Sequence, residues 1–330
     1  MKTKVVIFGC KTTTKFLIEN LSEKIKIDYL ITVDEKLGNR FNVADYCDLS
    51  ETAQLNNIEI YRAKQYNLKS REDLDFISSL NIDLAFVVGW QRLIPETILQ
   101  SLSIGAFGMH GSSMDLPLGR GRSPMNWSLI EGKKFFYTNL FKYNSGVDSG
   151  DILDTFKFTI TSEDTAETMH FKNTLSMKYL IFKNIDRMFN NSFTLKKQKD
   201  VTPTYYPKRN PTDSLIDWSS DIFKIERFIR AVTKPFNGSY SFICDTKVII
   251  YSSQIFETVD FGYSGELNGK IVEVFSNGKF LVNCSGGLLL INDYLCDVKV
   301  NKGDILYNRD EELHHFQTNT HGYYDLEEEE

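Results

Sequence analysis

Short apolar runs alternate with amphipathic stretches along the first 110 residues. The runs at 4–9 (KVVIFG) and 27–33 (IDYLITV) are rich in β-branched residues, whereas residues 13–24 between them place apolar side chains at helical spacing. A strand, a crossover helix and a second strand form a parallel βαβ unit. The alternation continues through strands at 58–63, 82–89 and 104–110 and helices at 70–80 and 95–102. We therefore expect an α/β fold built on a doubly wound, mostly parallel sheet.

The alternation resumes after a loop rich in proline and glycine that follows residue 110. The pattern predicts a helix over 123–132, strands over 134–143 and 152–160, and a long amphipathic helix over 164–190. We expect the apolar positions of this last helix to face the core, among them Met169, Leu175, Met177, Leu180 and Ile181.

A different pattern begins near residue 200. Residues 190–213 are polar and hold three prolines, which is typical of a connector, and residues 223–233 have helical spacing. Beyond them, short alternating stretches are separated by Asn-Gly dipeptides at 268–269 and 277–278, which are strong hairpin signals. We predict two domains, an α/β domain over 1–200 and a small antiparallel β-barrel domain with a leading helix over 201–330.

The composition argues against several classes of protein. No stretch approaches the ~20 consecutive apolar residues of a membrane span, and the chain begins with a strand pattern that lacks a signal-peptide cleavage site. The five cysteines are scattered and lack CxxC spacing, so neither a disulfide framework nor a structural zinc site is indicated. We expect a cytoplasmic protein with no membrane partner and no metal.

Charge is distributed unevenly along the chain. Residues 1–200 hold 26 Lys and Arg against 24 Asp and Glu, whereas residues 201–330 hold 12 against 20. Nucleic-acid binding needs a concentrated basic surface, because phosphate contacts dominate its affinity. We therefore expect no nucleic-acid partner. The acidic run at 325–330 is typical of a solvated tail and is assigned no role.

Two common nucleotide-binding motifs are missing from the sequence. A single Gly9 follows the first strand where a dinucleotide fingerprint would place GxGxxG, so nicotinamide or flavin binding is not indicated. The phosphate-binding pattern GxxxxGK[ST] is likewise absent.

His110 and Asp148 are the candidate catalytic residues. His110 stands at the end of a predicted central strand, where open α/β sheets collect their ligands, and Asp148 stands in the turn GVDSGD between two later strands. Glycines in that turn let the carboxylate point into a cleft, and a carboxylate beside an imidazole suits general-base chemistry. A histidine with a structural hydrogen bond and an ordinary polar turn are the alternatives that these residues alone leave open.

A longer series of residues extends this pair. The series comprises His110, Leu116-Pro117, Arg120-Gly121, Pro124 and the run Val147-Asp148-Ser149-Gly150-Asp151-Ile152. It resembles the formyltransferases that use 10-formyltetrahydrofolate, in which an Asn-x-His ends a strand and an Asp-Thr/Ser-Gly turn follows. The resemblance extends to Gly89-Trp90 with Leu93-Ile94-Pro95, and in the second half to Asp217-Trp218, Arg230-Ala231 and Pro235.

The chain departs from that pattern at two places. The loop from His110 to Leu116-Pro117 is two residues longer, and the asparagine expected two residues before the histidine is replaced by Gly108. The usual trio of Asn, His and Asp is thus reduced to His110 and Asp148. Asn126, Asn139 and Ser112, or backbone N–H groups of the loop, are the candidates for the missing donor.

The resemblance implies a Rossmann-like formyltransferase domain and a set of site residues. His110 and Asp148 would be catalytic. The candidates for binding the folate are Val88, Gly89, Trp90, Arg92, Leu93 and Asn144. The candidates for binding the second substrate are Ser112, Arg120, Arg122 and Asn126, where the two arginines would suit a diphosphate or carboxylate.

The resemblance also implies a reaction, the transfer of a formyl group from 10-formyltetrahydrofolate to an amine. Among sugar, transfer-RNA and small-metabolite enzymes, the sugar N-formyltransferases are most similar, and they too often carry a small C-terminal barrel. The expected substrate is a nucleotide-linked amino sugar. A methionyl-tRNA formyltransferase is the first alternative, although the acidic balance of residues 201–330 opposes a polyanion there. A folate- or nucleotide-binding relative without turnover is the second, and a homodimer stays open.

Overall fold

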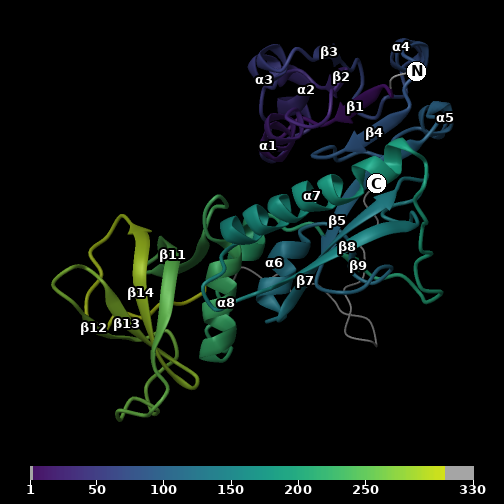
Figure 1. The fold of residues 1–330 in the computed structure, drawn as a ribbon. Helices are drawn as coiled ribbons and strands as arrows, with labels where there is room; N and C mark the ends of the chain where they lie inside the picture. The colour runs from purple at the N-terminus through teal and green to yellow at the C-terminus, as the bar shows by residue number, and fades with distance from the viewer. Residues whose placement is uncertain (1–2, 309–330) are drawn as a thin grey trace.

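The computed structural model describes residues 3–308 and contains two main β-sheets with helices around the first (Figure 1). The first sheet has seven strands in the order β3-β2-β1-β4-β5-β7-β8. The first five of these run parallel, and β7 and β8 are antiparallel to their neighbours. The strands are β1 Val5–Phe8, β2 Tyr29–Thr32, β3 Glu59–Arg62, β4 Leu84–Val87, β5 Gly105–Ser112, β7 Phe135–Lys142 and β8 Ile152–Thr159. The predicted doubly wound, mostly parallel sheet is confirmed.

Helices cover both faces of this sheet. All six predicted helices are present, and two short ones, α2 and α3, were not predicted from the sequence. The helices are α1 Thr12–Leu21, α2 Glu35–Arg40, α3 Ser50–Leu55, α4 Arg71–Ser79, α5 Glu96–Ser101, α6 Pro124–Ile130, α7 Ala166–Phe189 and α8 Ile222–Val232, with a 3-10 turn at Pro211–Ser214.

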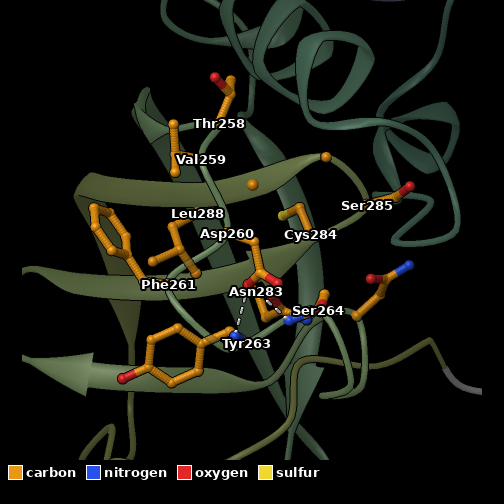
Figure 2. A pocket seen from close by; sticks show the side chains of 13 residues that line it. Thr258, Val259, Asp260, Phe261, Tyr263, Ser264, Asn283, Cys284, Ser285 and Leu288 are labelled. Atoms are coloured by element: carbon orange, nitrogen blue, oxygen red, sulfur yellow. Dashed lines mark hydrogen bonds between the residues drawn. The ribbon is translucent and has the colours of Figure 1, made fainter.

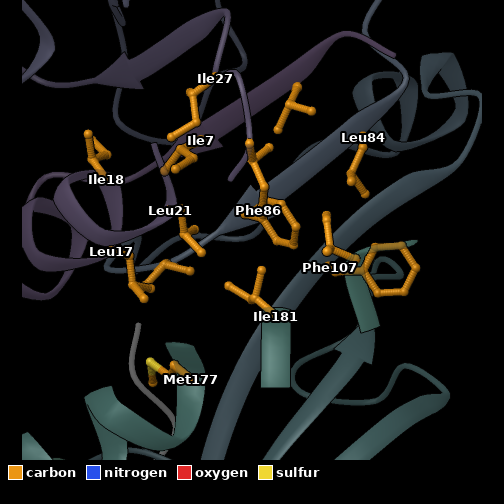
Figure 3. Close-up of a cluster of buried hydrophobic side chains, with 14 of the residues drawn as sticks. Ile7, Leu17, Ile18, Leu21, Ile27, Leu84, Phe86, Phe107, Met177 and Ile181 are labelled. Carbon is orange, nitrogen blue, oxygen red and sulfur yellow. The ribbon is translucent and has the colours of Figure 1, made fainter. Parts of the chain in front are cut away.

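The central strands β1 and β4 of the first sheet are apolar on both faces, because helices pack on each side. All four residues of β1 are buried, as expected for a central parallel strand. On one face, Ile7 and Phe86 pack with Leu17 of α1 and Ile181 of α7 (Figure 3). On the other face, Val6, Phe8 and Ala85 belong to a second apolar cluster that includes Ile98 of α5. The sheet is therefore a rigid platform for the loops at its carboxyl edge.

The long helix α7 corrects one expectation about the core. Met169, Leu180 and Ile181 are fully buried and Met177 is 9% exposed, whereas Leu175 is 43% exposed. Leu175 stands six residues after Met169 and six before Ile181, which puts it about 120° from each around an ideal helix axis, so it falls off the buried face. The prediction that Leu175 faces the core is wrong.

The second sheet is antiparallel, with strand order β10-β11-β14-β13-β12. Its strands are β10 Ser239–Ile243, β11 Thr246–Glu257, β12 Ile271–Val274, β13 Phe280–Cys284 and β14 Gly287–Cys296. Residues 303–307 join its two edges: Tyr307 and Phe242 exchange backbone hydrogen bonds on the β10 side, and Leu306 N donates to Gly269 O on the β12 side. These contacts close the sheet into a small barrel, as predicted.

The two Asn-Gly dipeptides of this region have different roles. Asn277-Gly278 lies in the turn that joins the antiparallel partners β12 and β13, so that hairpin is confirmed. Asn268-Gly269 does not join two paired strands, because β11 and β12 are not neighbours in the sheet. Gly269 instead pairs its backbone with Leu306 and Asn283. The hairpin predicted at 268–269 is wrong.

A connecting segment lies between the two sheets. Residues 205–206 form the short strand β9, Tyr205–Tyr206, which pairs with β6, Arg120–Gly121, beside the first sheet. Helix α8 follows, with its N-cap Asp221 accepting a hydrogen bond from Lys224 N, and it packs against both α6 and β11. The domain limits of 1–200 and 201–330 stay a prediction, since β9 lies beyond residue 200 yet contacts the first unit.

Within residues 3–308, no helix combines the length and apolar composition needed to cross a lipid bilayer. The acidic run at 325–330 lies outside the described residues.

Candidate functional site

His110 lies where the parallel part of the first sheet ends. Strand β5 pairs with β4 as far as Gly108, opposite Val87, and then continues along β7, where His110 stands opposite Asn139. The imidazole therefore projects just past the carboxyl end of β4, the edge at which open α/β sheets bind ligands. The side chain is 8% exposed.

Asp148 meets His110 at this edge. Its Oδ2 lies 3.2 Å from His110 Nδ1, and 18% of its side chain is exposed. The turn holds the carboxylate inward because Asp148 adopts a φ of 47°, in the left-handed region that aspartate tolerates better than most residues. Gly121 N also donates to Asp148 Oδ2, at 3.3 Å. The structure thus brings together the two side chains that the sequence analysis paired.

The second ring nitrogen of His110 faces the loop that follows β5. Nε2 lies 2.8 Å from the carbonyl oxygen of Gly119. A neutral imidazole donates through one nitrogen only, so it would satisfy either this carbonyl or the Asp148 carboxylate. An imidazolium satisfies both acceptors. The arrangement can therefore hold a positive charge at the carboxyl edge of the sheet.

Gln198 and Arg120 hold the Asp148 turn in place through hydrogen bonds. Gln198 Nε2 donates to the backbone oxygens of Asp148 (2.7 Å) and Gly150 (2.9 Å), while its Oε1 accepts from Arg120 Nη2 at 2.6 Å. Arg120 is 8% exposed and its Nη1 also donates to Tyr205 Oη. Arg120 was predicted to bind substrate. In the structure its guanidinium instead donates to the Gln198 side-chain amide inside the protein, and that amide in turn holds the Asp148 turn.

Thr204 fastens the loop that approaches His110. Its hydroxyl accepts from Gly119 N at 2.9 Å, and its carbonyl accepts from Arg120 N at 2.9 Å. The sequence analysis missed Gln198 and Thr204. They contact residues 50 and 85 positions away, and no local pattern in the sequence indicates a partner so distant.

Two predicted substrate ligands are sealed inside the protein. Ser112 has no exposed surface, and its hydroxyl accepts from Met114 N. Asn126 is 6% exposed, and its Nδ2 donates to Ala231 O at 2.7 Å, which ties α6 to α8. Both side chains therefore make hydrogen bonds within the protein, through Ser112 Oγ and Asn126 Nδ2.

The predicted folate residues divide into a buried group and an accessible group. Val88 and Trp90 are buried, and the Trp90 indole packs edge-on against Phe8 and Tyr66. Leu93 is 48% exposed, and the half-buried Arg92 lays its guanidinium over the Tyr66 ring, 5.0 Å from the centroid. The buried pair shapes the floor of this region, so direct contacts to a ligand would come from the accessible group.

Gly89 and Asn144 complete the predicted folate set through backbone conformation. Gly89 has a φ of 73°, and a Cβ there would lie 3.1 Å from Cβ of Lys11, so the close approach of the two loops requires glycine. Asn144 is exposed, and its Oδ1 accepts from Gly146 N (3.1 Å) and Ser149 Oγ (2.6 Å). Asn144 therefore shapes the turn that carries Asp148.

Three basic side chains, Lys11, Arg122 and His170, influence one another electrostatically. Burial lowers the pKa of the Lys11 ammonium at the start of α1; the nearby Asp45 carboxylate raises it, and the Arg122 guanidinium lowers it. Burial also lowers the pKa of His170 in α7, and the charge of Lys11 lowers it further. Like charges gathered at the carboxyl edge of a sheet suit an anionic ligand. Lys11 and His170 were absent from the residues predicted from the sequence.

Two other hollows lie outside this site. One, of about 280 Å³, lies in the barrel between the 258–268 loop and the turn joining β13 and β14, where Asp260 accepts hydrogen bonds from its own loop (Figure 2). The other, of about 760 Å³, lies between α8 and β11 and includes Arg227, Arg230 and Lys234. Neither contains His110 or Asp148, so neither alters the assignment of the candidate site.

Comparison with protein families gives two adjoining matches. Residues 2–179, more than half of the chain, match the formyl transferase family, and residues 208–299 match the formyl transferase C-terminal domain. A curated relative is the bifunctional polymyxin resistance protein ArnA of Wigglesworthia glossinidia brevipalpis, 33% identical over 189 residues. That match spans 57% of this chain and 29% of ArnA.

Solved structures share the fold. WlaRD, a sugar 3N-formyl transferase crystallised in the presence of dTDP and 5-N-formyl-THF, is 21% identical and has a TM-score of 0.65, covering 89% of this chain and 98% of WlaRD. An N-formyltransferase from Helicobacter canadensis, in complex with folinic acid and dTDP-3-aminofucose, is 22% identical with a TM-score of 0.64, covering 89% of this chain and all of that enzyme. At such identities the likeness establishes the architecture. Together with the match over residues 2–179, it shows that this chain belongs to the formyl transferase family.

Proposed function

We propose that this protein transfers the formyl group of 10-formyltetrahydrofolate to the amine of a nucleotide-linked amino sugar. The observation that carries the proposal is the 3.2 Å contact between His110 and Asp148 at the ligand-binding edge of a formyl transferase sheet. Support for the substrate class comes from WlaRD and the Helicobacter canadensis enzyme, whose crystals hold a formylated folate together with dTDP or dTDP-3-aminofucose.

The reaction exchanges one carbon–nitrogen bond for another. The sugar amine attacks the formyl carbon, the bond from that carbon to the folate nitrogen breaks, the amine loses a proton and the folate nitrogen gains one. Negative charge develops on the formyl oxygen in between. A neutral His110 would accept the amine proton at Nε2 once the substrate amine takes the place of Gly119 O beside that nitrogen, and an imidazolium held by Asp148 would stabilise the developing charge.

The proposed folate-binding region is defined by the solvent-accessible residues among those predicted to bind the folate. We expect the pterin between the 88–93 loop and the turn at 144–148, with Arg92 and Leu93 at its rim and Trp90 beneath. Both segments lie beside the end of β5, so a formyl group held there would lie near His110. Holding the donor and the amine in attack geometry supplies a large part of the rate enhancement in such reactions.

The nucleotide would use the basic cluster of Lys11, Arg122 and His170. A diphosphate carries two charges spread over several oxygens, which suits the Arg122 guanidinium, the Lys11 amine and an imidazole. Arg122 thus stays a proposed substrate ligand, whereas Arg120 becomes a support for the Asp148 turn.

The alternatives are distinguishable by substrate. A methionyl-tRNA formyltransferase needs a basic surface for the polyanion, and residues 201–330 carry 20 acidic against 12 basic residues. A binding relative without turnover would retain the folate but leave every amine unmodified.

The test is formyl transfer from 10-formyltetrahydrofolate to a panel of dTDP- and UDP-linked amino sugars, with initiator methionyl-tRNA and phosphoribosyl glycinamide as competing acceptors. We expect a formylated nucleotide sugar, seen by mass spectrometry, and release of tetrahydrofolate in equal amount. Formylation of the tRNA alone would favour the first alternative. Folate binding without any formylated product would favour the second.

A further inference from the structure

The space beside His110 is occupied by a tyrosine from the neighbouring strand. Gly108 stands two residues before His110, so any side chain at 108 would project on the same face of β5 as the imidazole. A Cβ built at Gly108 would overlap Cε2 of Tyr143 and lie 2.8 Å from its Cζ, the atom that carries the hydroxyl. The residue is glycine because the tyrosine ring fills the position that a side chain would take.

Two contacts hold Tyr143 in this place. It directly follows β7, and its backbone N donates to Ala106 O at 2.8 Å, which continues the pairing of β7 with β5. Its ring stacks on that of Phe141, with centroids 5.2 Å apart and planes 9° from parallel. The phenol is half-buried and is thus directed across β5 by its backbone and by its ring neighbour.

We propose that the Tyr143 hydroxyl donates a hydrogen bond to the formyl oxygen during transfer, from the space that Gly108 leaves open beside His110. The inference rests on the proposed function and adds a catalytic residue to it. In the pattern that this chain resembles, a side-chain amide at the Gly108 position would project into this space, so a donor reaches it here from β7 instead of β5.

The chemistry of the phenol suits this role. Burial raises the pKa of Tyr143, and the nearby Asp148 carboxylate raises it further, so the group stays protonated at neutral pH. A neutral phenol donates one hydrogen bond as negative charge develops on the formyl oxygen. No bond to Tyr143 forms or breaks, and the proton that leaves the amine still goes to His110 or to water.

The other candidates for the missing donor fit less well. Asn139 stands opposite His110 and its Nδ2 has no partner among the described residues, but the side chain is 3% exposed and Thr155 of β8 holds its Oδ1. Ser112 has no exposed surface. Tyr143 is the candidate that combines a donor, access and a position on the face of His110.

The test compares Tyr143→Phe with Tyr137→Phe, a matched change on the same strand at a tyrosine beside Ser112. Tyr143→Phe keeps the ring over Gly108 and removes the donor. We expect kcat to fall by about 10²–10³-fold, with little change in the KM of either substrate, because a bond already present to the bound formyl oxygen strengthens as negative charge develops on that oxygen. Tyr137→Phe should retain the wild-type kcat. Equal rates for wild type and Tyr143→Phe would overturn the inference.

A second measurement works without turnover. The formyl C=O stretch of isotope-labelled 10-formyltetrahydrofolate bound to the protein should lie at lower frequency in wild type than in Tyr143→Phe, since a hydrogen bond weakens the carbonyl. An unshifted stretch would overturn the inference even if the sugar substrate were wrong. Formyl transfer together with a shifted stretch supports both proposals. A shifted stretch with no amine that becomes formylated refutes the proposed function alone. Failure to bind the folate refutes both.

A double variant distinguishes hydrogen-bond donation by the Tyr143 hydroxyl from packing of the Tyr143 ring. Gly108→Asn combined with Tyr143→Ala replaces the phenol by an amide in the same space. We expect its kcat to exceed that of Tyr143→Ala alone, because the amide restores a donor. Rescue by Tyr143→Leu, which restores only apolar volume, would show instead that Tyr143 acts by packing.

Discussion

The two sheets of this molecule use buried polar groups differently. At the carboxyl edge of the first sheet, His110, Arg120 and Asn126 are buried, and each makes a hydrogen bond to a loop or a neighbouring helix. The interior of the barrel is apolar by comparison, with residues such as Val282 and Leu289 fully or almost fully buried. Polar networks position chemical groups, whereas apolar packing supplies stability. Substitutions in the two regions should therefore change different measurements.

The largest difference between the effect on catalysis and the effect on folate binding is expected for His110→Ala. We expect formyl transfer to fall by about 10²–10⁴-fold, because the variant lacks both the base and the imidazolium, while the affinity for the folate stays nearly unchanged. Steady-state kinetics and a fluorescence titration with the folate measure the two quantities. Wild-type rates in the variant would remove His110 from the mechanism.

Leu289→Ala is the counterpart in the barrel. Leu289 of β14 is fully buried and pairs with Ile255 and Val282, so the truncation leaves a cavity. We expect the free energy of unfolding to fall by about 2–5 kcal/mol, with kcat per folded molecule unchanged. Leu295→Ala, on the same strand but 58% exposed, is the matched control and should cost little. A large loss of kcat in Leu289→Ala would show that the barrel takes part in the chemistry.

The same division between apolar packing and polar networks decides which features could be predicted from the sequence. The alternation of apolar runs predicted the five parallel strands. Central strands such as β1 and β4 are buried on both faces and are continuous apolar runs, whereas β3 at the sheet edge is partly exposed. The sequence pattern also paired His110 with Asp148, which the structure places near the end of β5 and in the turn between the antiparallel strands β7 and β8. Gly108 could be noticed but not explained, because the atoms that exclude a side chain there belong to Tyr143, 35 positions later on another strand.

Three residues predicted to bind the substrate have partners within the protein. Ser112, Arg120 and Asn126 stand in the right part of the chain, yet their side chains turn inward to partners such as Ala231 and Gln198. A polar residue near a site is as useful for fastening a loop as for binding a ligand, and its type alone does not distinguish the two roles. Only the three-dimensional partner does.

Gln198→Ala tests that fastening role. The variant removes two hydrogen bonds to the Asp148 turn and one partner of buried Arg120, without touching the reacting atoms. We expect kcat to fall by about 10–100-fold with the KM values nearly unchanged, as for a small displacement of a catalytic group. Gln100→Ala on the exposed side of α5 is the control. A change confined to KM would place Gln198 in substrate binding instead.

The smallest effect is expected for Leu175→Ala, and its value lies in the contrast with Leu180→Ala on the same helix. Leu180 is fully buried and Leu175 is 43% exposed, although both belong to one apolar series in the sequence. We expect a loss of about 2–5 kcal/mol for Leu180→Ala and less than about 0.5 kcal/mol for Leu175→Ala, measured by urea unfolding. Equal losses would mean that another surface covers Leu175 in solution. Such a result would indicate self-association of the protein. A leucine that is 43% exposed buries too little apolar surface within this chain for its truncation to lower the free energy of unfolding by several kcal/mol.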